Sequence, residues 1–416
     1  MNVWIITIFE PLPYGHPKTR PQRCGMLTRS LLKKGHNVVL WTSNFEHNNH
    51  KHYFRGNKLS QESDRLSIQY LDGYGYSHDI SLKRIFHNHK TAHEFHKIAR
   101  KHQFPPDVIF APIPSLELAE AAVKFAKEKV CPIVVDIRDL WPDVYLSVFK
   151  GYFKYFARIF IYPEILRAKR ILKGATSITA VSERYLKWGL DYAGREKLIS
   201  DQIFHLGFID NHNGDFNSNS DLIDIKKLYG IDDNKCLVIF VGSFSDFYDI
   251  KCIFDAAKIL SEDGRAHFLI VGSGKDEIKF HKLAQSLPNL TMTGWIDFQD
   301  VCKLLKVSDI GLVAYSKNAT MSLPNKPFEY MAFGLPLLSS LKGELESIIR
   351  ENKIGKIYEA GNPITLAKEI LWFIDNMEIA RSMGDASLKL FESKYSERII
   401  YDKFSSYIEN IAEIKW

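Results

Sequence analysis

Residues 322–336 (Ser-Leu-Pro-Asn-Lys-Pro-Phe-Glu-Tyr-Met-Ala-Phe-Gly-Leu-Pro) bring together groups that suit a nucleoside diphosphate. The stretch predicts a loop and then a short helix, with a proline in its first turn and Gly334 after its end. The start of such a helix presents free N–H groups and a partial positive charge. Lys326 adds a full charge there and Glu329 lies one turn further on. The pattern therefore predicts a site for a diphosphate beside a ribose.

The same residues also fit an ordinary connection between a helix and a strand. Under this alternative Glu329 caps the start of the helix and Lys326 is solvated. The residue types alone leave both interpretations open.

Two loops in the first half of the chain carry further candidates. Residues 136–139 (Asp-Ile-Arg-Asp) follow a run that predicts a buried strand, and polar groups of α/β sites gather after such strands. Arg138 is a candidate for contacting a phosphate or an acceptor with Asp139 orienting it; the alternative is a structural Arg–Asp pair. His16 and Arg20 lie in the loop after the first strand. They are candidates for acceptor or phosphate contacts, unless that loop is only solvated.

Short β-branched runs alternate with amphipathic stretches, which is typical of parallel sheets covered by helices on both faces. The first half predicts strands at 3–9, 37–42, 68–71, 107–111, 133–137, 177–181 and 202–206, and a helix at 22–34. The second half predicts strands at 237–242, 267–272, 290–293, 309–314, 335–340 and 356–358. The tail predicts a helix with one apolar face, formed by Ile400, Phe404, Tyr407, Ile408 and Ile411.

A chain of 416 residues predicts two domains, each of about 200 residues. The polar, aperiodic stretch 211–220 predicts a linker between them. We therefore expect a first doubly wound domain at 1–208, a linker at 209–222, a second domain at 223–394 and a C-terminal helix at 395–416. Ligands of such domains bind at the carboxyl ends of the strands.

The composition is that of a soluble globular enzyme, with 45% hydrophobic and 25% charged residues. A net charge of +6 is mild, and no nucleic-acid reading module is present, so a nucleic-acid partner is not expected. Five scattered cysteines indicate a reducing compartment without disulfides or structural zinc. Seven histidines are predicted to lie on an exposed basic face: His47, His50, His52, His87, His89, His93 and His96. We expect a cytoplasmic protein, because neither a leader peptide nor a membrane span is predicted.

Residues 150–173 mix aromatic and basic side chains in a segment too short to span a bilayer. The segment could lie on the inner face of an anionic plasma membrane as a peripheral contact. Alternatively it is a helix that packs its aromatic side into the first domain. The two interpretations are compatible if only the basic edge meets lipid.

Residues 329–336 (Glu-Tyr-Met-Ala-Phe-Gly-Leu-Pro) resemble the donor-binding motif of the family 4 retaining glycosyltransferases. Residues 137–143 are similar to a segment of the bacterial O-antigen and capsule branch, typified by an N-acetyl-L-fucosaminyltransferase. Segments 32–42, 180–183, 269–274 and 294–312 also occur in the order of the family. The resemblance therefore covers nearly the whole chain.

This resemblance implies the GT-B fold, in which two Rossmann-like domains face each other across a cleft and the last helix crosses back to the first domain. The implied activity is retaining transfer of a sugar from a nucleoside diphosphate to a glycan. We expect a UDP-linked donor carrying an N-acetylated or 6-deoxy sugar. The expected acceptor is a polyprenyl-diphosphate-linked oligosaccharide of a bacterial surface polysaccharide. The family works without a metal, so no cofactor is expected.

The resemblance also assigns donor-binding roles. Glu329 matches the second glutamate of the Glu-x7-Glu motif, which holds the ribose hydroxyls in relatives, whereas Met321 replaces the first. Ser243 stands where many relatives carry an arginine that grips the diphosphate. Lys326 is then expected to neutralise the phosphates. The remaining expected donor contacts are Ser243, backbone amides around Ser322, Asn325, and Trp295 and Ile296 at the base, although a core position for Trp295 fits equally well.

The predicted catalytic set is Arg138, Asp139 and Lys326, with Arg138 at the place of a histidine in many relatives. Two alternatives remain open. One is a GT-B sugar-nucleotide epimerase, which would need acid and base groups around the sugar that the sequence does not identify. The other is a catalytically silent protein that binds a sugar nucleotide or lipid, which Met321 and Ser243 suggest.

Overall fold

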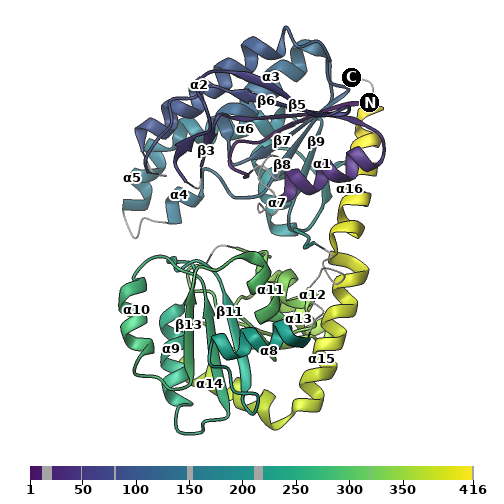
Figure 1. Ribbon diagram of the computed structural model, residues 1–416. Helices are drawn as coiled ribbons and strands as arrows, with labels where there is room; N and C mark the ends of the chain where they lie inside the picture. The colour runs from purple at the N-terminus through teal and green to yellow at the C-terminus, as the bar shows by residue number, and fades with distance from the viewer. Residues whose placement is uncertain are drawn as a thin grey trace. The chain divides into compact units, whose positions relative to one another are not determined.

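The computed structural model describes residues 1–11, 21–47, 49–78, 81–147, 153–209, 219–319 and 321–414. The chain divides into two compact units (Figure 1): unit 1 contains Met1–His205 and Ile400–Trp416, and unit 2 contains Leu206–Ile399. Each unit has its own sheet, which is mainly parallel in unit 1 and fully parallel in unit 2. Most of the predicted linker 209–222 lies outside the described residues.

Unit 1 is built on an eight-stranded sheet in the order β10-β9-β8-β7-β1-β2-β6-β5. Its strands are β1 (Asn2–Ile6), β2 (Asn37–Ser43), β5 (Lys58–Ser63), β6 (Leu66–Leu71), β7 (Val108–Ile113), β8 (Ile133–Ile137), β9 (Ser177–Ala180) and β10 (Gln202–Ile203). Only β5 runs antiparallel to its neighbour in this sheet. Every residue of β7 and β8 is buried, as expected for central parallel strands with apolar sequences.

Aromatic rings fill the core between this sheet and the helices α2 (Leu82–Ala99) and α3 (Leu116–Lys129). The Trp4 ring lies 4.7 Å from that of Trp41 and 5.3 Å from that of Phe125. The Trp41 ring in turn meets Phe95 of α2 edge-on, at 4.8 Å. These contacts fix α2 and α3 against the central strands.

The other helices of unit 1 are α1 (Arg23–Lys33), α4 (Val144–Ser147), α5 (Phe153–Phe160), α6 (Tyr162–Lys173), α7 (Glu183–Ala193) and α16 (Glu397–Ala412). The predicted apolar face of the tail helix is buried. In α16, Phe404 stacks on Phe204 with ring centroids 4.0 Å apart. The Ser30 hydroxyl of α1 donates to the Tyr401 carbonyl at 2.9 Å. The C-terminal residues thus complete the core of unit 1.

Unit 2 holds a six-stranded, fully parallel sheet in the order β13-β12-β11-β14-β15-β16. Its strands are β11 (Cys236–Val241), β12 (Ala266–Val271), β13 (Leu290–Gly294), β14 (Ile310–Val313), β15 (Leu337–Ser339) and β16 (Gly355–Ile357). Numbered along the chain, this is the 3-2-1-4-5-6 order of a Rossmann sheet. The carboxyl ends on either side of β11 and β14 are where ligands of such sheets bind.

Helices cover both faces of the unit 2 sheet, with α9 (Ile250–Ile259) and α10 (Glu277–Ala284) on one face and α12 (Lys326–Ala332) and α13 (Glu344–Asn352) on the other (Figure 1). The remaining elements are α8 (Asn219–Leu228), α11 (Phe298–Lys306), α14 (Pro363–Asp375), α15 (Met377–Leu390) and a π-helical turn, Phe391–Tyr395. Two doubly wound α/β units were predicted from the sequence, and this architecture is confirmed.

All seven strands predicted for the first half and all six predicted for the second half are present, with ends shifted by a few residues. Three strands were missed: β3 (Phe45–Glu46), β4 (Lys51–His52) and β5. The residues of β5 are exposed except for one that is half-buried, so it lacks the apolar alternation that marks a strand. The two short strands β3 and β4 pair only with each other.

The prediction that the histidines lie on an exposed face is wrong for His87, which is buried on α2. Its Nδ1 accepts the Gly75 N–H at 3.0 Å, and its Nε2 lies 3.3 Å from the Ser43 hydroxyl. His47 contacts the Tyr76 hydroxyl at 2.7 Å. These histidines therefore belong to an aromatic cluster around Phe45 and Tyr76. All five cysteines are buried, and none of them forms a disulfide.

Candidate functional site

The helix predicted to bind a diphosphate is α12, and Tyr330 fixes it to the central strands of unit 2. The Tyr330 hydroxyl accepts the Val241 N–H of β11 at 2.9 Å and donates to the Leu312 carbonyl of β14 at 3.3 Å. The Tyr330 ring lies against Gly311, where an added Cβ would fall 2.6 Å from the ring. The start of α12 is therefore held at the binding edge of the sheet.

Lys326 and Glu329 form an ion pair at the start of α12. The Lys326 Nζ lies 2.8 Å from Glu329 Oε2, and the two side chains are 22% and 4% exposed. The alternative in which Lys326 is only solvated is thus wrong. The buried Glu329 carboxylate can accept hydrogen bonds from hydroxyl groups. The partly exposed Lys326 ammonium beside it can contact an anion.

The loop before α12 holds three of the other predicted donor contacts. Ser322 is buried and its hydroxyl donates to Glu344 Oε2 of α13 at 3.0 Å. Met321 is half-buried and Asn325, the residue before α12, is exposed. The structure thus brings Ser322, Asn325, Lys326 and Glu329 together at one helix start. The Ser322 side chain already has a partner, which leaves backbone groups for a ligand.

Ser243 is exposed in the loop that follows β11, next to the loop that follows β12. The Phe244 N–H donates to the Ser273 carbonyl at 2.8 Å, and the Lys275 N–H donates to the Phe244 carbonyl at 2.8 Å. Gly272 has φ +137°, and a Cβ there would lie 2.0 Å from the Gly242 carbonyl oxygen. Glycine is therefore required for the close approach that fixes the loop carrying Ser243.

Trp295 and Ile296 follow β13, the edge strand of the sheet. Trp295 is 75% exposed, so the alternative of a core position is wrong. Ile296 is half-buried. Strand β12 separates their strand from β11, which precedes Ser243. An exposed indole at the binding edge is available for stacking, which keeps the predicted role at the base open.

In unit 1 the predicted pairing of Arg138 with Asp139 is wrong. Arg138 forms an ion pair with Glu10, whose Oε2 also accepts the Cys24 N–H at 2.9 Å. Asp139 instead accepts the Leu140 N–H at 2.8 Å and the Trp141 indole N–H at 3.2 Å. Burial raises the pKa of Asp139 above its ordinary value despite these bonds. The Arg138 side chain is 21% exposed, whereas that of Glu10 is 4% exposed.

Sequence reasoning missed the buried pair formed by Arg23 and Asp136. Arg23 donates to both carboxylate oxygens of Asp136, at 2.7 and 2.8 Å, and to the Phe204 carbonyl at 2.7 Å. Thr179 also donates to Asp136 at 2.7 Å. Both ions have no exposed side-chain area, so the pair is a structural link between β8, α1 and the chain after β10. Glu10 was also missed; its only sequence signal is a lone carboxylate after the first strand.

The predicted acceptor contacts His16 and Arg20 lie outside the described residues. Arg138 and Asp139 belong to unit 1 and Lys326 to unit 2. Among the described residues, no group of three or more histidine, cysteine or acidic side chains could hold a metal ion. No helix in the described part of the chain is long and apolar enough to cross a membrane.

The site lies within the part of the chain that matches a known protein family. Residues 221–390, which contain α12 and the loop of Ser243, match the family model described as glycosyl transferases group 1. The crystal structure of Anabaena HepE in complex with UDP covers 99% of this chain and 100% of its own, with a TM-score of 0.67 at 13% identity. The fold is therefore GT-B, as the sequence predicted.

Two curated relatives are similar to part of the chain. N-acetyl-alpha-D-glucosaminyl L-malate synthase of Bacillus anthracis is 26% identical over 198 residues, 47% of this chain and 51% of that protein. Chitobiosyldiphosphodolichol beta-mannosyltransferase of Candida albicans is 22% identical over 184 residues, 42% of this chain and 40% of that protein. The chain thus spans about half the length of these relatives or less. Residues 221–390 are thus similar to the group 1 glycosyltransferases, and the solved structure shows the fold.

Proposed function

We propose that this chain is a retaining, hexosyltransferase-type glycosyltransferase that uses a UDP-linked sugar. The observation that carries the proposal is the Lys326–Glu329 pair at the start of α12, inside the stretch that matches the family model. The UDP complex of a protein with the same fold supports UDP as the nucleotide. Met321, in place of a glutamate that contacts the donor sugar in relatives, favours an N-acetylated or 6-deoxy sugar.

In the proposed reaction Glu329 accepts the ribose hydroxyls and Lys326 neutralises the diphosphate. The acceptor hydroxyl attacks the anomeric carbon on the face from which the diphosphate leaves. The bond from that carbon to the phosphate oxygen breaks as the bond to the acceptor oxygen forms, and the leaving phosphate takes the acceptor proton. Fixed positive charge at the phosphate stabilises this transition state, so a metal ion is not needed. Arg138 and Asp139 are the proposed catalytic contribution of unit 1.

The proposed acceptor is a polyprenyl-diphosphate-linked oligosaccharide of a bacterial surface polysaccharide. The name of the Candida relative, which refers to a diphosphodolichol, supports a lipid-linked acceptor. Phe156, Ile159 and Phe160 of α5 and Leu82 and Phe86 of α2 expose large apolar side chains. Such a surface beside basic residues suits peripheral contact with an anionic bilayer on the cytoplasmic side.

The test of the donor site is calorimetric titration of UDP, GDP and dTDP without added metal. Wild-type protein is compared with Lys326→Ala and with Lys258→Ala, an exposed lysine on α9 that serves as the matched control. We expect selective UDP binding that Lys326→Ala weakens by tenfold or more, roughly 1.4 kcal/mol, and that Lys258→Ala leaves unchanged. Equal binding by both variants would remove Lys326 from the phosphate site.

A catalytically silent sugar-nucleotide binder is the second candidate, because Met321 and Ser243 lack the polar groups of relatives. Incubation with UDP-sugars and product analysis separates the classes. Slow release of UDP with free sugar, or with a glycosylated acceptor, indicates a transferase, and conversion to an epimeric UDP-sugar indicates an epimerase. UDP binding without turnover of any donor would favour the silent binder.

A further inference from the structure

Unit 1 contains a pocket of about 490 Å³ at the carboxyl-end edge of its sheet. Pro114 and Leu116 line it after β7, and Trp141 and Tyr145 line it after β8. The first turns of α2 and α6 close the other sides. A volume of this size holds a small organic ligand, and this edge of a parallel sheet is where α/β proteins bind them.

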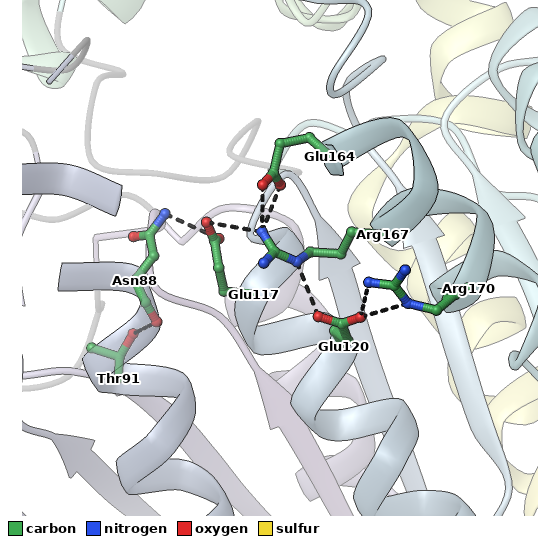
Figure 2. Close-up of polar contacts among 7 residues, drawn as sticks. All are labelled: Asn88, Thr91, Glu117, Glu120, Glu164, Arg167 and Arg170. Atoms are coloured by element: carbon green, nitrogen blue, oxygen red, sulfur yellow. Dashed lines mark hydrogen bonds and ion pairs between the residues drawn. The ribbon is translucent and has the colours of Figure 1, made fainter. Parts of the chain in front are cut away.

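The pocket has a polar wall formed by Asn88 of α2 and Glu117 of α3 (Figure 2). The Asn88 Nδ2 donates to Glu117 Oε2 at 3.2 Å. Asn88 is 8% exposed, and its Oδ1 has no hydrogen-bond partner within the described part of the chain. A buried acceptor without a partner is unfavourable, so a ligand that donates a hydrogen bond there would recover stability.

The carboxylates around this wall are held in place by arginines of α6, as Figure 2 shows. Arg167 contacts Glu164 at 2.6 Å, Glu120 at 3.0 Å and Glu117 at 3.6 Å. Arg170 contacts Glu120 at 2.7 Å. Three carboxylates thus share two guanidinium groups, which disfavours a phosphate in contact with this wall. Burial raises the pKa of Glu117, which further favours a neutral partner.

The opposite side of the pocket is mostly apolar, apart from Arg84, whose guanidinium lies 5.3 Å from the centre of the Trp141 ring. Trp141 and Tyr145 supply aromatic faces, whose rings lie 4.5 Å apart edge to face. At the rim, Leu82 is 73% exposed, Ile85 is 44% exposed and Phe160 is 83% exposed. Aromatic faces pack on the apolar faces of sugar rings, while an exposed aliphatic rim suits an alkyl or isoprenoid chain.

We propose that this pocket binds a neutral glycoside with an apolar aglycone. A sugar hydroxyl donates to Asn88 Oδ1 and a second donates to Glu117. The ring packs against Trp141 or Tyr145, and the aglycone lies over the apolar rim at Leu82 and Phe160. If the proposed function holds, on which this part rests, the pocket is an acceptor subsite for a neutral sugar unit that is not itself joined to the acceptor diphosphate.

The test uses monomeric octyl glucoside as the probe, below the concentration at which it forms micelles, in calorimetric titration of the full chain. Glucose, octanol and octyl phosphate are the comparison ligands. We expect saturable octyl glucoside binding about tenfold or more tighter than any of the three, a difference of roughly 1.4 kcal/mol. Equal binding of octanol or tighter binding of octyl phosphate would overturn the proposal, because neither carries the sugar.

Two variants locate the binding. Asn88→Leu removes the unpaired acceptor and is expected to abolish the preference for octyl glucoside over octanol. Leu82→Ser changes an exposed rim residue and is expected to weaken octyl glucoside several-fold without lowering the melting temperature. Leu59→Ser, at an exposed position of β5, is the matched control and should have no effect. Unchanged binding in Leu82→Ser and in a folded Asn88→Leu would place the ligand elsewhere and overturn the proposal.

UDP titration of the same samples separates the two proposals. UDP binding that is equal in wild type and both variants, together with loss of glycoside selectivity, supports the pocket and leaves the donor site intact. Glycoside binding without any UDP binding would keep the pocket and contradict the proposed transferase.

Discussion

Glu10 contacts the Arg138 guanidinium with one carboxylate oxygen and accepts the Cys24 N–H at 2.9 Å with the other. The carboxylate is almost completely buried, whereas Arg138 is partly exposed. One side chain thus ties the loop after β1 to the first turn of α1 and to the loop after β8.

The first prediction concerns this pair. Glu10→Gln should lower the free energy of unfolding of unit 1 by roughly 1–3 kcal/mol, because Arg138 loses its counter-ion in a half-buried position. Urea unfolding followed by circular dichroism measures the change. Glu62→Gln, on the exposed strand β5, is the control and should stay within ~0.5 kcal/mol of wild type. A similar small change in Glu10→Gln would contradict a structural role for the pair.

The second prediction concerns the ribose contact of Glu329. Wild-type protein should bind UDP more tightly than 2′,3′-dideoxy-UDP by about tenfold, because a carboxylate accepts the two hydroxyl groups. In Glu329→Ala the two nucleotides should bind equally. This cycle isolates the hydroxyl contact from any general effect of the substitution. A preference for UDP that persists in the variant would assign the ribose to another group.

The third prediction concerns Gly272, where the loops after β11 and β12 meet. Gly272→Ala should destabilise unit 2 by about 3 kcal/mol or more, since its Cβ would lie 2.0 Å from a carbonyl oxygen and its φ is +137°. Gly264→Ala provides the control, because its φ is +72° but nothing lies within 4 Å of its Cβ. We expect only roughly 1 kcal/mol there. Equal losses in thermal or urea unfolding would show that backbone strain alone explains both.

The fourth prediction concerns acid sensitivity at His87. Burial, followed by the nearby His52 and Arg84, lowers the pKa of His87 to about 4. In the unfolded chain this histidine has a pKa of about 6.5. The contribution of neutral His87 to stability is therefore complete above that pH and is lost as the pH falls towards 4. Protonation of His87 should therefore lower the free energy of unfolding by about 2 kcal/mol between pH 7.5 and pH 5.

Urea unfolding at the two pH values measures this loss, and His87→Gln is the comparison. The variant keeps polar groups near Gly75 and Ser43 but does not titrate. Its stability should fall less than that of the wild type between pH 7.5 and 5. Parallel losses in the two proteins would assign the acid sensitivity to other groups.

The sequence predicted the elements well where apolar runs are continuous. The buried strands β7, β8, β11 and β12 carry such runs, and the proline and glycine around α12 mark its limits. Strand β5 was not predicted because its side chains face solvent. Its pairing is set by β6 rather than by its own sequence pattern. Hydrophobic periodicity in a sequence reflects which residues are buried. An exposed edge strand therefore shows little of this pattern.

The candidate site was predictable only where its residues are neighbours in the sequence. Lys326 and Glu329 are one helical turn apart, so their proximity follows from the helix itself. The partner of Arg138 is 128 positions away, and sequence proximity pointed to Asp139 instead. The pocket wall likewise joins Asn88 to Glu117 across two helices. Contacts of this kind are set by tertiary packing, which no local pattern encodes.

Because all five cysteines are buried, their reactivity reports when the surrounding structure unfolds. Burial raises the pKa of Cys131, Cys236 and Cys252 to about 12 and that of Cys24 well above its ordinary value. Thiol reagents attack only the exposed thiolate, so the native protein should resist labelling. Cys24 and Cys131 lie in unit 1 and the other three in unit 2. Pulsed alkylation with peptide mapping would therefore time the unfolding of each unit separately, without any added probe.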